Sequence, residues 1–236
     1  MTDALKDEIR QAYTTLMDSK QLTPRWGQRQ MIAEIAKTLG NIPGPGEAKP
    51  SAPAVCVIEA GTGTGKTIAY AVTAIPMALA LDKRLIVATA TVALQEQFVN
   101  KDLPDIKRHS GLEFTYALAK GRRRYVCLSK LDRLLVEGKG ETGMLALQPE
   151  ELEPATPVEA VPVYNAMIDA LGRGQWDGDR DNWPDAIAEG IWFPATTDHA
   201  QCTGRRCPNI AQCSFFQARD ELQNADVIVT NHDLAL

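Results

Sequence analysis

Apolar residues recur along the chain in two different rhythms, and each rhythm predicts a different kind of element. In 3–19 and again in 24–40 they fall three and four residues apart, which is typical of amphipathic helices. From residue 54 onward, short continuous apolar runs alternate with longer stretches of helical pattern. Runs of that kind are typical of strands that are buried on both faces of a sheet.

Four apolar runs are the predicted strands: 54–60, 84–90, 112–118 and 225–231. Helices are predicted over 66–81, 91–109 and 214–224. Strands that alternate with helices of this length indicate an α/β fold with a parallel, doubly wound sheet. Because Cys56 lies inside the first apolar run, we expect it to be a core residue.

The segment between the third and fourth predicted strands differs in character from the rest of the chain. It spans roughly a hundred residues, carries four of the five cysteines and is rich in Asp and Glu. A structureless loop of that length is uncommon in a compact domain. We therefore expect an inserted subdomain at 119–215, with 1–118 and 216–236 forming the main α/β domain.

Composition narrows the class of protein. Hydrophobic residues make up 44% of the chain and charged residues 23%, as in soluble globular proteins. No apolar run approaches the length of a membrane span, and the N-terminus lacks the apolar core of a signal peptide. We therefore expect a cytoplasmic protein without a membrane partner, whose cysteines are thiols available to a metal.

The net charge of −5 argues against a protein surface that is basic overall and attracts nucleic acid. A local basic track is compatible with that net charge, since binding depends on where Lys and Arg cluster. They cluster in 119–135, whereas 137–200 is rich in Asp and Glu.

The stretch AGTGTGKT lies between a predicted strand and a predicted helix, as a phosphate-binding loop does. It departs from the pattern GxxxxGK[ST] only at Ala60, which stands at the first glycine position. Its glycines let successive backbone N–H groups face a phosphate at the helix N-terminus. Lys66 would reach the β- and γ-phosphates of ATP and Thr67 would bind Mg²⁺, so both are candidate catalytic residues. The predicted nucleotide-binding residues of this loop are Ala60, Gly61, Thr62, Gly63, Thr64, Gly65, Lys66 and Thr67.

Upstream of the loop, Arg25 and Gln28 share one face at the start of the second predicted helix. Their side chains could hydrogen-bond an adenine edge or a phosphate. These motifs stand in a fixed order over nearly the whole chain: PRWGQRQMI, EAGTGTGKT, ATATVALQEQ, KDLP, GRRRYVC, QWDGDRD, CTGRRCPNIAQC and DVIVTNHDL. In that order they resemble the N-terminal part of DinG-type bacterial DNA helicases, in the XPD-like branch of superfamily 2.

The resemblance implies a RecA-like P-loop NTPase domain that is interrupted by an iron–sulfur domain. It implies that Arg25 and Gln28 contact the nucleotide, and that Ala60 is the usual residue of the helicase form of the loop. The implied activity is ATP-driven 5′→3′ movement along single-stranded DNA with unwinding at duplex junctions, in DNA repair. We expect a monomer. Near the single-strand path the resemblance places Thr89, Thr91 and Gln95.

The stretch 202–213 supplies three thiolates and leaves two alternatives for a fourth ligand. A zinc finger of this spacing would need a histidine at Gln217, although His199 lies close enough in sequence to serve. The resemblance instead implies a 4Fe–4S cluster, and four thiolates are the usual ligands of such a cluster. We favour the cluster because the finger spacing fails. Its expected ligands are Cys127, Cys202, Cys207 and Cys213.

Cations flank the cysteines on both sides, and we expect them to follow the phosphates of single-stranded DNA. These residues are Arg122, Arg123, Arg205 and Arg206. In the resembled family a DExH box follows downstream, and the chain contains none. We therefore expect an N-terminal helicase fragment with little ATPase activity of its own. Two alternatives stay open: a P-loop module without motor activity, and a zinc-bearing nucleic-acid adaptor.

Overall fold

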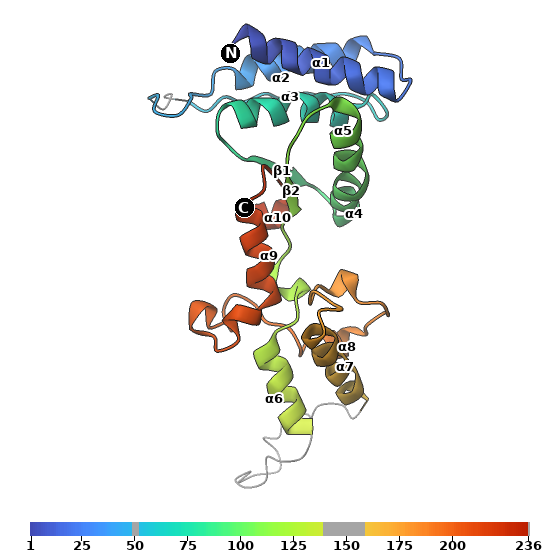
Figure 1. Ribbon diagram of the computed structural model, residues 1–236, viewed down its shortest axis with the longest axis vertical. Helices are drawn as coiled ribbons and strands as arrows, with labels where there is room; N and C mark the ends of the chain where they lie inside the picture. Colours follow the sequence, from blue (N-terminus) through green and yellow to red (C-terminus); the bar gives the residue numbers. More distant parts are fainter. Residues whose placement is uncertain (49–51, 139–158, 236) are drawn as a thin grey trace. The chain divides into compact units, whose positions relative to one another are not determined.

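The computed structural model describes residues 1–48, 52–138 and 159–235, and the chain divides into two compact units (Figure 1). Unit 1 comprises Met1–Ala119 and Leu222–Leu236, and unit 2 comprises Lys120–Glu221. Residues 139–158 of the predicted insert lie outside the described residues. No helix in the described ranges is long and apolar enough to cross a membrane.

Unit 1 contains a parallel sheet of three strands, which confirms the predicted α/β class. The strands are β1 (Leu85–Thr89), β2 (Tyr116–Leu118) and β3 (Val227–Asn231), in the order β1-β3-β2. Leu85 of β1 and Tyr116 of β2 both stand opposite Val227 of the central strand. The last apolar run of the sequence therefore returns to the middle of the sheet, between two strands that precede it by more than a hundred residues.

Helices cover this sheet, and their bounds agree with the apolar periodicity. They are α1 (Asp3–Ser19), α2 (Trp26–Leu39), α3 (Lys66–Ala80), α4 (Val92–Gln97), α5 (Leu103–Ser110) and α10 (His232–Ala235). A π-helical turn, Phe98–Asp102, joins α4 to α5, where Pro104 lacks the N–H that a continuous helix would use. Helix α3 packs against α1 and α2, and α1 also contacts α5 (Figure 1).

The core of unit 1 gathers one face of each of these elements. α1 contributes Tyr13 and Leu16, α3 contributes Val72 and Ile75, and β3 contributes Val229, and all five are at least 94% buried. Burial of large apolar side chains is worth roughly 1.5–3 kcal/mol each. This core fixes the start of α3, and with it the loop that precedes the helix.

The strand predicted over 54–60 is not formed, and this corrects the sequence-based expectation. Among the described residues it pairs with no other strand, and the exposed fractions of Val55 and Val57 are 69% and 90%. Cys56, predicted to be a core residue, is exposed as well. An apolar run becomes a buried strand only when neighbours supply hydrogen bonds on both sides. Among the described residues, no strand pairs with the outer edge of β1 either, and Ile86 of that strand is 62% exposed.

Unit 2 has a core of its own, built largely from aromatic residues. Its helices are α6 (Leu128–Gly138), α7 (Ala160–Gly172) and α8 (Glu189–Trp192), and α9 (Ser214–Gln223) begins in it. Trp176 packs edge-on against Trp183 and Trp192, with ring centroids 4.7 and 6.4 Å away. Trp192 is 2% exposed and donates its indole N–H to the carbonyl of Arg123 at 2.9 Å. Unit 2 therefore has an apolar core separate from that of unit 1.

Candidate nucleotide loop and cysteine site

The predicted phosphate loop forms a tight turn that ends at the N-terminus of α3. Gly63 and Gly65 have φ angles of 72° and 79°, a left-handed conformation that residues other than glycine adopt at a cost. Gly65 is the N-cap residue of α3. Inside the loop, the Thr64 hydroxyl donates to the carbonyl of Gly61 at 2.8 Å. A fifteen-residue helix thus points its positive end at the space inside the loop, as anion sites do.

Lys66 lies folded onto the loop that it follows. Its Nζ donates to the carbonyl oxygens of Ala60 and Gly61 at 2.5 and 3.0 Å. The side chain is exposed, so the ammonium group can leave these carbonyls for a phosphate oxygen without crossing a packed core. The following residue, Thr67, hydrogen-bonds Tyr70, whose pKa is raised to about 12 mainly by burial.

Arg25 and Gln28, which the resemblance implies as nucleotide contacts, both hydrogen-bond the backbone of the loop. The Arg25 guanidinium donates to the carbonyl of Gly63, and the Gln28 amide donates to that of Gly65 at 3.5 Å. Gln28 is 5% exposed, and its amide oxygen accepts a hydrogen bond of 2.9 Å from the Tyr13 hydroxyl. Tyr13 was not predicted as a site residue. It lies 15 residues from Gln28 on another helix, so nothing in the local sequence signals the contact.

Gly65→Ala is expected to weaken ATP binding by about ten- to a hundredfold. A Cβ at this position would lie 1.9 Å from Gln28 Nε2, so the amide would have to leave the loop. That displacement costs about 1 kcal/mol of hydrogen bonding, and the left-handed backbone adds about 1–2 kcal/mol. The measurement is the dissociation constant of a fluorescent ATP analogue.

Gly63→Ala and Gly61→Ala serve as matched controls for this prediction. Gly63 has the same positive φ, but a Cβ there would meet no atom within 4 Å, whereas Gly61 has neither constraint. The loss of affinity should grow in the order Gly61→Ala, Gly63→Ala, Gly65→Ala. Equal losses at Gly63 and Gly65 would show that the Gln28 contact has no part in binding.

The residues expected near single-stranded DNA divide into two groups. Thr89 ends β1 and donates to the carbonyl of Thr91 at 3.0 Å, and Thr91 caps α4 by accepting from the Leu94 N–H at 3.2 Å. Both threonines lie at a strand end or a helix start, where phosphate contacts are common. Gln95 is 5% exposed, and its amide donates to the carbonyl of Ala119 at 3.3 Å. Its side chain therefore supports the end of β2 and does not face solvent.

In unit 2, the stretch that carries Cys127 lies against the stretch that carries the other three cysteines. Arg122 Nη1 is 2.9 Å from Cys202 Sγ, and Ser129 Oγ is 3.3 Å from Cys207 Sγ. The Asn209 amide also donates to Ser129 Oγ, at 3.3 Å. All four cysteines are partly buried free thiols. Segments 75 and more residues apart in sequence thus bring the predicted ligands into one region, called the cysteine site below.

The thiols of the cysteine site have different local electrostatics. Burial raises the pKa of Cys127, and negative charge on Cys213 and Cys207 raises it further. The hydrogen bond from Ser129 lowers the pKa of Cys207.

The spacing of these thiols bears on what they can bind. A single tetrahedral Zn²⁺, with Zn–S bonds of about 2.3 Å, needs its thiolates about 3.8 Å apart. In the part of the chain that the structure describes, no three His, Cys, Asp or Glu side chains are arranged to hold one ion. A 4Fe–4S cluster takes one thiolate at each of four irons and spreads its ligands more widely. The cysteine site offers four thiols, the donor type that such a cluster takes, although no three of them are arranged around one point.

The basic stretch 120–124 is largely neutralised by acidic residues of the same unit. Lys120 pairs with Asp179 and lies 2.8 Å from Asp181, and Arg124 pairs with Asp181. Burial raises the pKa of Asp179, and the Lys120 ammonium opposes that shift. The motif QWDGDRD thus provides counter-ions to Lys120 and Arg124, a pairing that sequence reasoning missed.

The four arginines expected to contact DNA lie in two different environments. The Arg122 guanidinium stacks on Phe215, 4.1 Å from the ring centroid, in addition to its contact with Cys202. Arg123 pairs with Asp198 at 2.8 Å and lies over the Phe193 ring. Arg205 and Arg206, on a short helical turn between Cys202 and Cys207, are exposed and form no ion pair among the described residues. They are the cations of this set that are free to meet a phosphate.

The chain is similar over nearly all of its length to known proteins. No protein-family model matches it. The chain is 40% identical, over all of its length, to the ATP-dependent DNA helicase DinG of Escherichia coli (strain K12). It is 39% identical to the proteins of the same name from Photobacterium profundum, over 98% of its length, and Salmonella choleraesuis, over all of it. It spans about a third, 32%, of the length of each relative. Over its length the chain therefore matches a DinG-type helicase N-terminal fragment.

Proposed function

We propose that the complete protein is an ATP-dependent DNA helicase and that this chain supplies the nucleotide loop of a RecA-like motor domain. The observation that carries the proposal is the pair of contacts from Arg25 and Gln28 to the backbone of the glycine loop. These contacts connect the start of α2 to a glycine loop whose backbone turns as in phosphate-binding loops, and Lys66 and Thr67 follow at its end. Mg²⁺ would be held by the Thr67 hydroxyl together with phosphate oxygens.

The proposed activity is the coupling of ATP hydrolysis to 5′→3′ movement along single-stranded DNA, with unwinding at duplex junctions. The test uses the complete protein and a labelled duplex that carries either a 5′ or a 3′ single-stranded tail. ATPase activity that single-stranded DNA stimulates, with displacement only from the 5′-tailed duplex, is the expected result. ATP binding without DNA-stimulated turnover would favour the alternative of a P-loop module without motor activity.

We also propose that unit 2 is an iron–sulfur domain inserted into the motor domain. Its cluster would be 4Fe–4S, with Cys127, Cys202, Cys207 and Cys213 as ligands. The contacts of Arg122 and Ser129 with two of these thiols support the assignment, because hydrogen bonds to ligand sulfurs stabilise negative charge on them. Anaerobically purified protein should contain about four iron and four acid-labile sulfide per chain. Zinc in place of iron would favour the nucleic-acid adaptor.

Arg205→Ala combined with Arg206→Ala is expected to weaken single-stranded DNA binding about tenfold at low salt. For each phosphate that the variant no longer neutralises, the slope of log affinity against log salt should also fall by about 0.7. Fluorescence anisotropy of labelled oligothymidine with the complete protein measures both quantities.

Arg173→Ala is the control for this pair, because Arg173 is an exposed cation of unit 2 at the end of α7, away from the cysteine stretch. It should leave both affinity and salt slope unchanged. The proposed DNA track would be rejected if the double variant kept the wild-type salt slope.

A further inference from the structure

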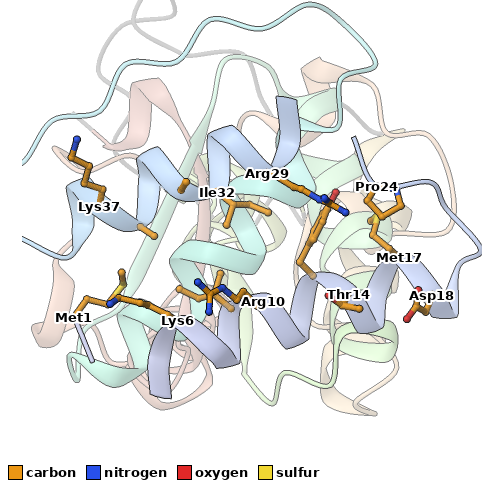
Figure 2. Close-up of a pocket in the computed structure, with 14 residues that line it drawn as sticks. Met1, Lys6, Arg10, Thr14, Met17, Asp18, Pro24, Arg29, Ile32 and Lys37 are labelled. Carbon is orange, nitrogen blue, oxygen red and sulfur yellow. The ribbon is translucent and has the colours of Figure 1, made fainter. Parts of the chain in front are cut away.

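A groove lies between α1 and α2 on unit 1, apart from the phosphate loop and the cysteine site. Its volume is about 650 Å³, within the usual range of ligand pockets. Figure 2 shows side chains of both helices lining it, with Lys6 and Arg10 on one helix and Arg29 and Lys37 on the other. None of these four cations has a role in the function proposed above.

The inner surface of the groove is apolar. Ile9, Tyr13 and Met17 of α1 are buried at its base, together with Ala36 of α2. Met1 and Ile32 are partly exposed along it. Methionine side chains adapt to different apolar partners, so Met1, which is 46% exposed, suits a surface that accepts side chains from another molecule.

The rim of the groove is basic, although the chain as a whole is acidic. Four cations line the groove against one carboxylate, Asp18, whereas the net charge of the chain is −5. Lys6 and Arg10 bond Asp3 and Asp7 of their own helix at 2.7 and 3.0 Å. Exposed pairs of this spacing contribute little and exchange readily with other carboxylates. Arg29 and Lys37 form no ion pair in the described part of the chain.

We propose that this groove is a docking site for an acidic, amphipathic peptide segment of a partner protein. Large apolar side chains of the segment would enter the base, and its carboxylates would meet the four cations of the rim. Nucleic acid fits less well, because bases bind by stacking on an exposed ring face. Among the described residues that line the groove, Tyr13 is the only aromatic one, and it is 6% exposed and donates its hydroxyl to Gln28.

The test titrates the complete protein into a fluorescein-labelled synthetic peptide, and anisotropy reports binding. The peptide carries Asp and Glu on one helical face and Leu and Phe on the other. Arg29→Glu with Lys37→Glu should weaken binding about tenfold or more, because both rim charges change sign. Ala33→Phe, which fills the groove from an exposed position, should weaken binding without changing charge. Lys83→Glu, an equal charge reversal on an exposed residue outside the groove, should leave binding within about twofold.

Matched peptides decide between the proposal and its competitors. A peptide with Lys in place of Asp and Glu, or with Ser in place of Leu and Phe, should not bind. Equal binding of either peptide, or an unchanged affinity of the Ala33→Phe variant, would overturn the proposal. Competition by oligothymidine for the peptide site would also overturn it. The proposal would fail as well if this chain bound the peptide and the complete protein did not, because another part of the longer protein would then occupy the groove. None of these outcomes depends on ATPase activity or on the metal content of unit 2.

Discussion

Replacing Lys66 with alanine is expected to lower ATP hydrolysis by the complete protein about 10²- to 10³-fold. This is the loss typical of removing one preorganised group that stabilises transition-state charge. Lys66 is the cation at the start of α3, and its ammonium lies on the carbonyls of Ala60 and Gly61. Phosphate oxygens would take the place of those carbonyls when ATP binds. The measurement is steady-state ATPase activity with saturating single-stranded DNA.

Lys83→Ala provides the control, since Lys83 is an exposed lysine of the same unit beyond the far end of α3. It should retain wild-type turnover. Single-stranded DNA affinity measured without nucleotide should survive Lys66→Ala, because the loop does not contribute to the proposed DNA track. A Lys66→Ala protein that hydrolyses ATP at the wild-type rate would show that the glycine loop is not the catalytic phosphate site.

The second large effect is expected at the cysteine site, where Cys207→Ser should remove the metal and abolish unwinding. Loss of one of the four thiolates would leave one iron of the cluster without its protein ligand. Metal binding contributes on the order of 10 kcal/mol to the folding free energy of small metal-bound modules. Unit 2 has its own core around Trp176 and Trp192, so we expect it to lose stability without unfolding completely. ATP affinity should stay within about twofold, because the phosphate loop belongs to unit 1. Iron content, thermal unfolding and strand displacement give three separate readouts.

Cys56→Ser makes the same chemical change at a cysteine that is exposed and belongs to unit 1. Iron content and unwinding should both be unaffected by it. If Cys207→Ser retained full iron and sulfide, Cys207 would not be a ligand. If it lost the iron but kept full unwinding, the cluster would have no part in the motor.

The helices of unit 1 up to residue 110, the helix at 214–224 and three of the four strands could be predicted because local pattern determines them. Apolar spacing alone sets the faces of α1 and α2, and runs such as 84–90 and 225–231 carry enough apolar residues to form strands. The run 54–60 has the same local character, yet its environment differs. Strand formation depends on partners elsewhere in the chain, which a local pattern does not contain.

The nucleotide loop could be predicted for a similar reason, since its glycines, lysine and threonine are contiguous. The environment of the basic stretch could not, because its counter-ions lie about sixty residues away. Arg122 illustrates this difference: its sequence context suggests a DNA contact, whereas its guanidinium lies between Cys202 and Phe215. Tyr13, whose hydroxyl positions Gln28, likewise depends on the packing of two helices.

The unpaired run 54–60 has a practical consequence for the isolated chain. Val55 and Val57 lie in solvent, and in the described part of the chain the outer edge of β1 (Leu85–Thr89) pairs with no other strand. Apolar, β-branched residues beside an open strand edge favour intermolecular strand pairing, which is the usual route to aggregation. The chain on its own should therefore precipitate as its concentration rises, and a charged residue at Val57 should act as a gatekeeper that keeps it in solution.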